Sequence, residues 1–260
     1  MTADEILSQL VETFFNQYGI KYSKHESISL LLGRYFNFRL KYIVLSKRTI
    51  KISNTLLNSV SNCPAKEAFY DILYKTGEGL DLNPYQSKGA FNADVHDGLF
   101  NDWGIHHLHL STTKKKSHDY FFDRSDYLLF VKFTDDTAYF LNVEKHKEAN
   151  VWSKKEYIRI IQQNWPESIA DKEVPNVQWT PDLDDRQTGE LRNKGYLFGV
   201  NVDEKAYLLL GHGQASSGDN MMAMRLSDEI FRWIHQNEHL LSESQIAFEN
   251  ELKKILYIDQ

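Results

Sequence analysis

A short run in the middle of the chain, Asp102–Leu110 (DWGIHHLHL), contains three histidines. Its mixture of apolar residues and histidines is typical of a short β-strand. Successive side chains of a strand point to opposite faces, so we expect His107 and His109 on one face and His106 on the other. Two imidazoles about 7 Å apart on one strand face can share a substrate or a metal ion.

A second group of polar residues follows a predicted hairpin. Segments 127–133 and 138–143 are rich in strand-forming residues, and they flank the acidic turn Thr134-Asp135-Asp136-Thr137. The second segment continues into Asn142, Glu144 and His146, whose even spacing predicts a common face. The odd positions of this strand are expected to face the core: Tyr139, Leu141 and Val143. If this strand lies beside the histidine strand, both sets line one pocket.

These residue types suit acid–base chemistry. Histidine titrates near neutral pH, so a pair of histidines can serve as base and acid in one reaction. Cleavage of RNA through its own 2′-hydroxyl needs such a pair, together with a cation at the phosphorane. We expect His109 and His146 to form this pair beside His107, with Arg124 or Lys145 as the cation.

Neighbouring residues suit RNA binding. A lysine run can hold phosphates beyond the scissile one, and an exposed aromatic ring can stack on a base. The candidates for phosphate binding are Lys114, Lys115 and Lys116, and those for base stacking are Tyr120 and Trp152. This ribonuclease hypothesis requires no metal and no other cofactor.

Two alternatives remain open at this point. A His-x-His pair on one strand with a third histidine on its neighbour is also the arrangement of a three-histidine zinc site, with Glu144 in support, which predicts a metallohydrolase. The histidines can instead be structural. The protein would then be a module that binds nucleic acid or another protein.

The elements that position these residues carry recognisable signals. Thr2 and Glu5 form a capping box ahead of a helix, and Ser153 and Glu156 form a second one before a helix that ends at Asn164-Trp165-Pro166. A helix is also expected over 64–74. Residues 42–45 and 49–52 have the composition of short strands.

The order of these elements, helices followed by strands and then helices again, predicts the α+β class with a central antiparallel sheet. We expect an N-terminal helical and basic region over residues 1–90 and an α+β domain over residues 91–260, which together could form one domain.

Composition and charge narrow the class of protein. The chain has 260 residues, of which 42% are hydrophobic, so it can form a full-sized core. Its one cysteine, Cys63, rules out a framework of disulfides within the chain. No stretch approaches the roughly 20 apolar residues of a membrane span, and the N-terminus is acidic where a signal peptide is basic. We therefore expect a cytoplasmic protein that does not bind membranes.

The charge is unevenly distributed. Residues 21–60 contain eight basic residues and a single acidic one, so they carry +7 within a chain of −6, and the rest carries −13. A basic block inside an acidic chain predicts either a phosphate-binding surface or a solvated basic face.

Two resemblances bear on function. The stretches Gly79–Tyr85, Asp102–Leu110 and Asn164–Glu167 resemble a group of uncharacterised bacterial and phage-borne proteins, which implies no activity. Residues 103–152 resemble the sheet of RelE-like toxin ribonucleases of the barnase, EndoU and colicin group. That resemblance implies metal-free RNA cleavage on an antiparallel meander, in which His109, Arg124 and His146 take part. It also implies a role in toxin or phage-defence biology and a cognate inhibitor or antitoxin as a partner.

Overall fold

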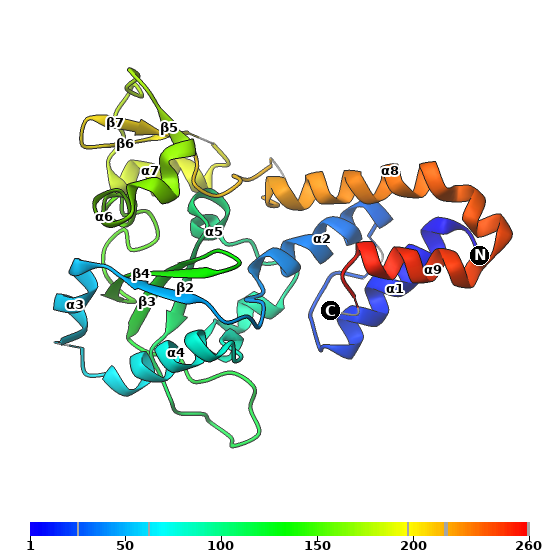
Figure 1. Ribbon diagram of the computed structural model, residues 1–260, viewed down its shortest axis with the longest axis horizontal. Coiled ribbons are helices and arrows are strands. Elements are labelled where there is room, and N and C mark those ends of the chain that lie inside the picture. Colours follow the sequence, from blue (N-terminus) through cyan, green and yellow to red (C-terminus); the bar gives the residue numbers. More distant parts are fainter. Residues whose placement is uncertain (25, 62, 197, 216–217, 259–260) are drawn as a thin grey trace.

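The computed structural model describes residues 1–24, 26–61, 63–196, 198–215 and 218–258 (Figure 1). Its helices are α1 Ala3–Gln17, α2 Ile28–Lys41, α3 Asn54–Ser61, α4 Lys66–Glu78, α5 Gly98–Trp103, α6 Glu156–Asn164, α7 Asp185–Asn193, α8 Met221–Glu243 and α9 Gln245–Ile255, with 3₁₀ turns η1 Asn83–Tyr85, η2 Lys88–Phe91 and η3 Pro166–Lys172. The strands are β1 Thr49–Ile52, β2 Ile105–His109, β3 Tyr127–Phe133, β4 Thr137–Lys145, β5 Glu173–Val174, β6 Val200–Val202 and β7 Lys205–Tyr207.

The main sheet has four strands in the order β1-β4-β3-β2. Strands β2, β3 and β4 form an antiparallel meander, which agrees with the expected hairpin at 134–137. The predicted α+β class is confirmed, but the sheet is mixed because β1 pairs with β4 in parallel. A parallel pair needs a long connection, and here residues 53–136, which include α3, α4, α5, β2 and β3, lie between the two strands.

Both faces of this sheet are covered (Figure 1). Helices α3 and α4 pack on one face, where their apolar residues meet Leu108, Leu129 and Phe140. The other face packs on α5, α6 and the small sheet β5-β7-β6. Its core includes Ile105 and Phe130. The histidine strand β2 is an edge strand, since it pairs with β3 alone.

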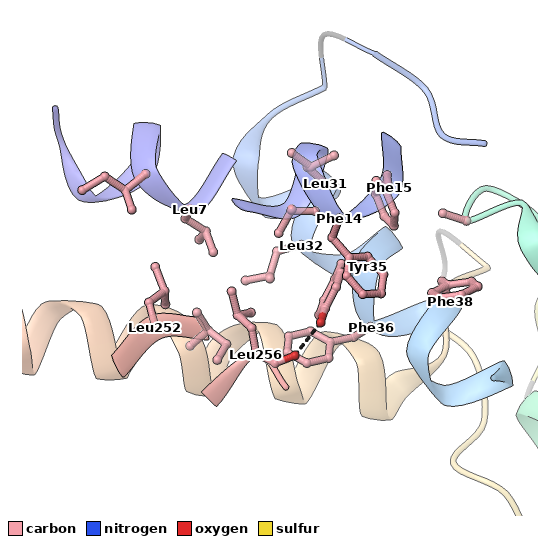
Figure 2. Packing of buried hydrophobic residues seen from close by; sticks show 14 of the residues in the cluster. Leu7, Phe14, Phe15, Leu31, Leu32, Tyr35, Phe36, Phe38, Leu252 and Leu256 are labelled. Atoms are coloured by element: carbon pink, nitrogen blue, oxygen red, sulfur yellow. Dashed lines mark hydrogen bonds between the residues drawn. The ribbon is translucent and has the colours of Figure 1, made fainter. Parts of the chain in front are cut away.

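The helices at the two ends of the chain form a separate bundle of α1, α2, α8 and α9 (Figures 1 and 2). The Thr2–Glu5 capping box is present at the start of α1, as expected. Figure 2 shows Leu7 of α1 and Tyr35 and Phe36 of α2 gathered with Leu252 of α9 and with Leu256, the residue that follows α9. The Tyr35 hydroxyl donates a hydrogen bond to the Leu256 carbonyl inside this core. Helix α2 leads from the bundle toward the sheet.

Some sequence-based expectations differ from the structure. The packing crosses the expected boundary near residue 90, because β1 joins the main sheet while α8 and α9 pack against α1 and α2, and the division into two regions stays a prediction. Residues 42–45 form no strand, since the Ile43 N–H donates to the Asn83 side chain instead. Ser153 does not cap α6, because its hydroxyl donates to the Asp185 carbonyl.

Within the described part of the chain, no helix combines the length and the apolar character needed to cross a bilayer.

The close approach of residue 211 to α5 gives a test of this packing. A Cβ on Gly211 would meet the Asn101 carbonyl oxygen and would lie 2.8 Å from two further backbone atoms, Gly104 N and Phe100 O. We expect Gly211→Ala to lower the free energy of unfolding by about 2 kcal/mol or more, because backbone must move to make room.

The matched control is Gly33→Ala in α2, where the new Cβ would make an ordinary 3.6 Å contact with the Met224 sulfur. Alanine is the better helix former, so this change should stabilise the protein by about 0.5–1 kcal/mol. Urea denaturation measures both, and a Gly211→Ala variant as stable as the wild type would contradict the packing described.

Candidate functional site

The two faces of β2 separate its histidines as expected. His107 and His109 pair across the sheet with Phe130 and Leu128, which belong to the core beneath α5 and α6. His106 pairs with Val131 of the opposite core, and its ring contacts Phe133. Side chains of directly paired residues lie on the same face of a sheet. The predicted alternation is therefore confirmed.

Strand β4 brings its polar residues to the same face, although β3 lies between it and β2. Asn142 and Glu144 pair with Phe130 and Leu128, so they share the face of His107 and His109. A register shift between Phe130 and Val131 marks a bulge, which changes the alternation along β4. We expected Tyr139, Leu141 and Val143 on the face opposite the polar residues. Because of the bulge, only Val143 lies on that face, while Tyr139 and Leu141 pack in the same core as Phe130.

Three of the expected histidines lie together around Trp152. The ring centroid of Trp152 lies 4.8 Å from that of His107 and 5.6 Å from that of His146. His146 in turn stacks on His109, with centroids 5.8 Å apart and planes inclined by 15°. The hairpin and the segment after it therefore bring these rings together without the direct pairing of β2 and β4 that we had assumed.

His109 is the most enclosed of the three rings. Its side chain belongs to a residue only 3% exposed, and its Nδ1 accepts a hydrogen bond from the Ser125 N–H at 3.3 Å. Burial, followed by the charges of His107 and His146, lowers the pKa of His109 to about 4. The ring is consequently neutral at pH 7, with its proton on Nε2. A base with so low a pKa accepts protons poorly at neutral pH.

His107 has a carboxylate beside it. Asp97 caps the start of α5, where its Oδ1 accepts a hydrogen bond from the Phe100 N–H at 3.0 Å. The other carboxylate oxygen, Oδ2, lies 3.5 Å from Nδ1 of His107. Nδ1 is buried and makes no hydrogen bond at this distance, but a carboxylate on this side of an imidazole favours the tautomer that carries its proton on Nδ1 and leaves Nε2 free to exchange protons.

A cavity of about 600 Å³ opens beside this pair. Its wall includes His107, Asp97 and Trp152, together with Lys41 from α2 and Arg192 from α7. His109 and His146 do not belong to the wall. The cavity therefore lies between the edge strand, α7 and the end of the helix that leads from the bundle.

His96 lines the same cavity, and we did not select it from the sequence. Its Nδ1 lies 3.7 Å from Oδ1 of Asp219, which also accepts a hydrogen bond from Arg34. Burial lowers the pKa of His96, although the nearby carboxylate of Asp219 opposes that shift. A signal that could have found His96 is its place in the long connection 79–97 between α4 and α5, since long ordered connections are often functional.

Arg192 forms a buried part of the wall and is only 5% exposed. Its Nε donates to Asp102 at 2.5 Å, its Nη1 donates to the Trp152 carbonyl, and its Cζ lies 4.7 Å from the ring centroid of Trp103. The remaining nitrogen, Nη2, is buried without a hydrogen-bond partner. Burial raises the pKa of Asp102, and the guanidinium opposes that shift.

The other predicted site residues lie away from the cavity. Lys114, Lys115 and Lys116 are exposed in the loop between β2 and β3, which runs below α4 in Figure 1. In that loop the Tyr120 hydroxyl donates to Asp81 and its ring packs on Phe91, although the residue remains exposed.

Neither predicted cation lies in the wall of the cavity. Arg124 is exposed, and its charge is one of several that lower the pKa of His109, after burial. Lys145 is exposed too. Its partner across the β3–β4 ladder is Tyr127, which packs against the core on the face opposite His107 and His109.

The basic block at 21–60 is largely engaged within the protein. Arg34 forms ion pairs with Asp219 and Asp94, and Arg48 donates to three backbone carbonyls. Lys47 and Lys51 form ion pairs with glutamates. Lys21 and Lys24, at the start of the block, are exposed, so a phosphate-binding surface there stays a prediction.

Among the residues that the structure describes, no three side chains of histidine, cysteine, aspartate or glutamate are grouped so that they could hold a metal ion. The three-histidine arrangement considered from the sequence is thus not found there.

No protein-family model, curated protein or solved structure matches this chain.

The buried state of His109 predicts how stability depends on pH. Its pKa is about 4 in the folded protein and about 6.5 when the chain unfolds, so the unfolded state binds the additional proton. Its contribution is complete above pH 6.5 and is lost as the pH falls toward 4. We expect it to account for about 2 kcal/mol of the stability lost between pH 7 and pH 5.

Denaturation at both pH values measures this effect in His109→Gln, which keeps an acceptor for the Ser125 N–H. The variant should lose about 2 kcal/mol less than the wild type between pH 7 and pH 5. The same change at His118, which is exposed, should leave the difference unaltered. Equal losses in wild type and His109→Gln would show that the ring is not buried in its neutral form.

Proposed function

We propose that the protein is a metal-independent ribonuclease whose acid–base pair is His107 and His96. The observation that supports this most strongly is that both imidazoles line one cavity and each has Nδ1 within 4 Å of a carboxylate, Asp97 or Asp219. Neither Nδ1 has a hydrogen-bond partner, but a carboxylate on the Nδ1 side favours the tautomer that leaves Nε2 for proton exchange. Two such groups in one cavity suit a reaction that needs a base and an acid together.

In the proposed reaction the base removes the proton of the RNA 2′-hydroxyl, and O2′ forms a bond to the adjacent phosphorus. The bond from phosphorus to the 5′ oxygen breaks, and the acid gives its proton to that leaving oxygen. The products are a 2′,3′-cyclic phosphate and a free 5′-hydroxyl. Asp97 and Asp219 would stabilise the imidazolium at each stage, and the nearby cations Lys41 and Arg192 would stabilise charge on the phosphorane.

This assignment differs from the one expected from sequence, which paired His109 with His146. Neither residue lines the cavity, and burial keeps His109 neutral. Their stack against Trp152 supports the wall of the cavity instead. We therefore place His109 and His146 outside the reacting pair.

The biological setting in this proposal comes from the sequence resemblance to toxin ribonucleases. An enzyme of this kind would act on cytoplasmic RNA, in toxin or phage-defence biology, and a cognate inhibitor or antitoxin would be its partner. Cys63 is buried and carries no disulfide, which is compatible with a reducing compartment.

The test is cleavage of total RNA by the purified protein in excess EDTA at pH 7. We expect the wild type to cleave and to leave 2′,3′-cyclic phosphate ends. His107→Asn and His96→Asn should each lose about 10²-fold or more in rate, since general acid–base groups contribute about 10²–10⁴-fold. His118→Asn, the matched change at an exposed histidine, should retain full activity.

A His109→Gln variant separates the two assignments, because it alters the stack but not the cavity wall. It should keep most of the activity at a temperature where it is folded. Cleavage that survives both His107→Asn and His96→Asn, or a wild type that cleaves no RNA in EDTA, would contradict the proposal.

A further inference from the structure

Lys41 is a buried cation in the wall of the cavity. It is the last residue of α2 and is only 4% exposed. Its Nζ donates to the backbone carbonyls of Val95 and Asn92, at 2.5 and 3.2 Å, and no carboxylate of the described residues lies within 4 Å of it. An ammonium group has three hydrogens to donate, so these two bonds leave one unused. Burial lowers the pKa of Lys41 to about 8, which leaves it largely protonated at pH 7.

Arg192 supplies a second buried donor to the same wall. Two of its nitrogens are bonded to Asp102 and Trp152, and Nη2 has no partner. Buried donors without acceptors are unfavourable. The charge of Arg192 is already compensated by Asp102, and the carboxylates of Asp97, Asp94 and Asp219 act on Lys41 from a distance, so it is the unused N–H groups that call for an acceptor. An anion bound in the cavity could accept from both groups. Phosphate oxygens suit this role, since both lysine and arginine bind them well.

Trp152 adds an aromatic surface to the cavity. It is 37% exposed, although His107 and His146 contact its ring. An exposed indole in the wall of a cavity that also contains buried cations can stack on a nucleobase. The 600 Å³ of the cavity falls within the range of sites for small ligands, roughly 300–1,000 Å³.

We propose that this cavity is a binding site for one nucleotide, which places its phosphate against Lys41 and Arg192 and its base against Trp152. A base can meet the indole only if it is unstacked from its neighbours, which single-stranded RNA allows and a duplex does not. The substrate class is therefore single-stranded RNA. This inference rests on the proposed function for the cleavage of RNA, whereas nucleotide binding itself does not depend on cleavage.

Calorimetric titration of the intact protein with 3′-UMP, 3′-AMP and inorganic phosphate tests the site. We expect Lys41→Met to weaken binding of the nucleotides by 10-fold or more, because methionine fills the space without the charge. Lys47→Met, at a surface lysine paired with Glu78, should bind as the wild type does. Thermal melting of both variants shows whether they are folded.

The aromatic contact is tested separately. Trp152→Ala should weaken nucleotide binding by about 10-fold and leave the binding of inorganic phosphate unchanged, and Trp152→Phe should restore most of the nucleotide affinity. An equal effect of Trp152→Ala on phosphate and nucleotides would contradict base stacking.

The outcomes separate this inference from the proposed function. A protein that cleaves RNA but binds these nucleotides equally well after Lys41→Met, or cleaves duplex and single-stranded RNA at equal rates, would overturn the inference and leave the ribonuclease proposal standing. A protein that binds nucleotides in the expected pattern but cleaves no RNA would support the binding site and overturn the ribonuclease proposal. No nucleotide binding by the folded wild type would overturn the site.

Discussion

The buried ion pair between Arg192 and Asp102 is the contact on which the arrangement of the cavity depends. It joins Arg192 of α7 to Asp102 of α5, and both side chains are almost completely buried. Asp102 is followed within a few residues by β2, so the pair also fixes the edge strand that carries His107. Removing one partner of a buried pair leaves an uncompensated charge, which typically costs about 3–5 kcal/mol, a large fraction of the roughly 5–15 kcal/mol by which folded proteins are stable.

The helical bundle contributes to the same cavity, although its core is separate from that of the sheet. Helix α2 brings Lys41 to the wall, and Arg34 of the same helix binds Asp219, the carboxylate beside His96. The loop that follows η2 supplies both His96 and Asp97. The two ends of the chain are therefore needed to complete a site whose first signal was in the middle of the sequence.

Local patterns predicted a substantial part of this structure. The alternation along β2 depends only on neighbouring residues, and the hairpin and the Thr2 capping box are equally local. The class of fold followed from these elements. The histidine-rich strand was expected where the structure has β2, and the structure places Trp152 against His107 and His146.

What could not be predicted depends on contacts between distant parts of the chain. Asp97 and His107 are ten positions apart in the sequence, while His96 and Asp219 are 123 positions apart. The burial of His109 and the pairing of the basic block with glutamates and aspartates arise only from tertiary packing. A bulge in β4, which reversed part of the expected alternation, has no signal of its own in that strand.

The central claim is that the nearby carboxylates of Asp219 and Asp97 favour the tautomers of His96 and His107 that leave Nε2 for proton exchange. Long-range ¹H–¹⁵N NMR of the imidazole rings tests it directly, with Asp97→Asn as the comparison, since asparagine also caps a helix well and should preserve α5. The account predicts that both rings carry their proton on Nδ1 when neutral, and that only His107 loses this preference in Asp97→Asn. Neutral rings that carry the proton on Nε2 in the wild type would contradict it.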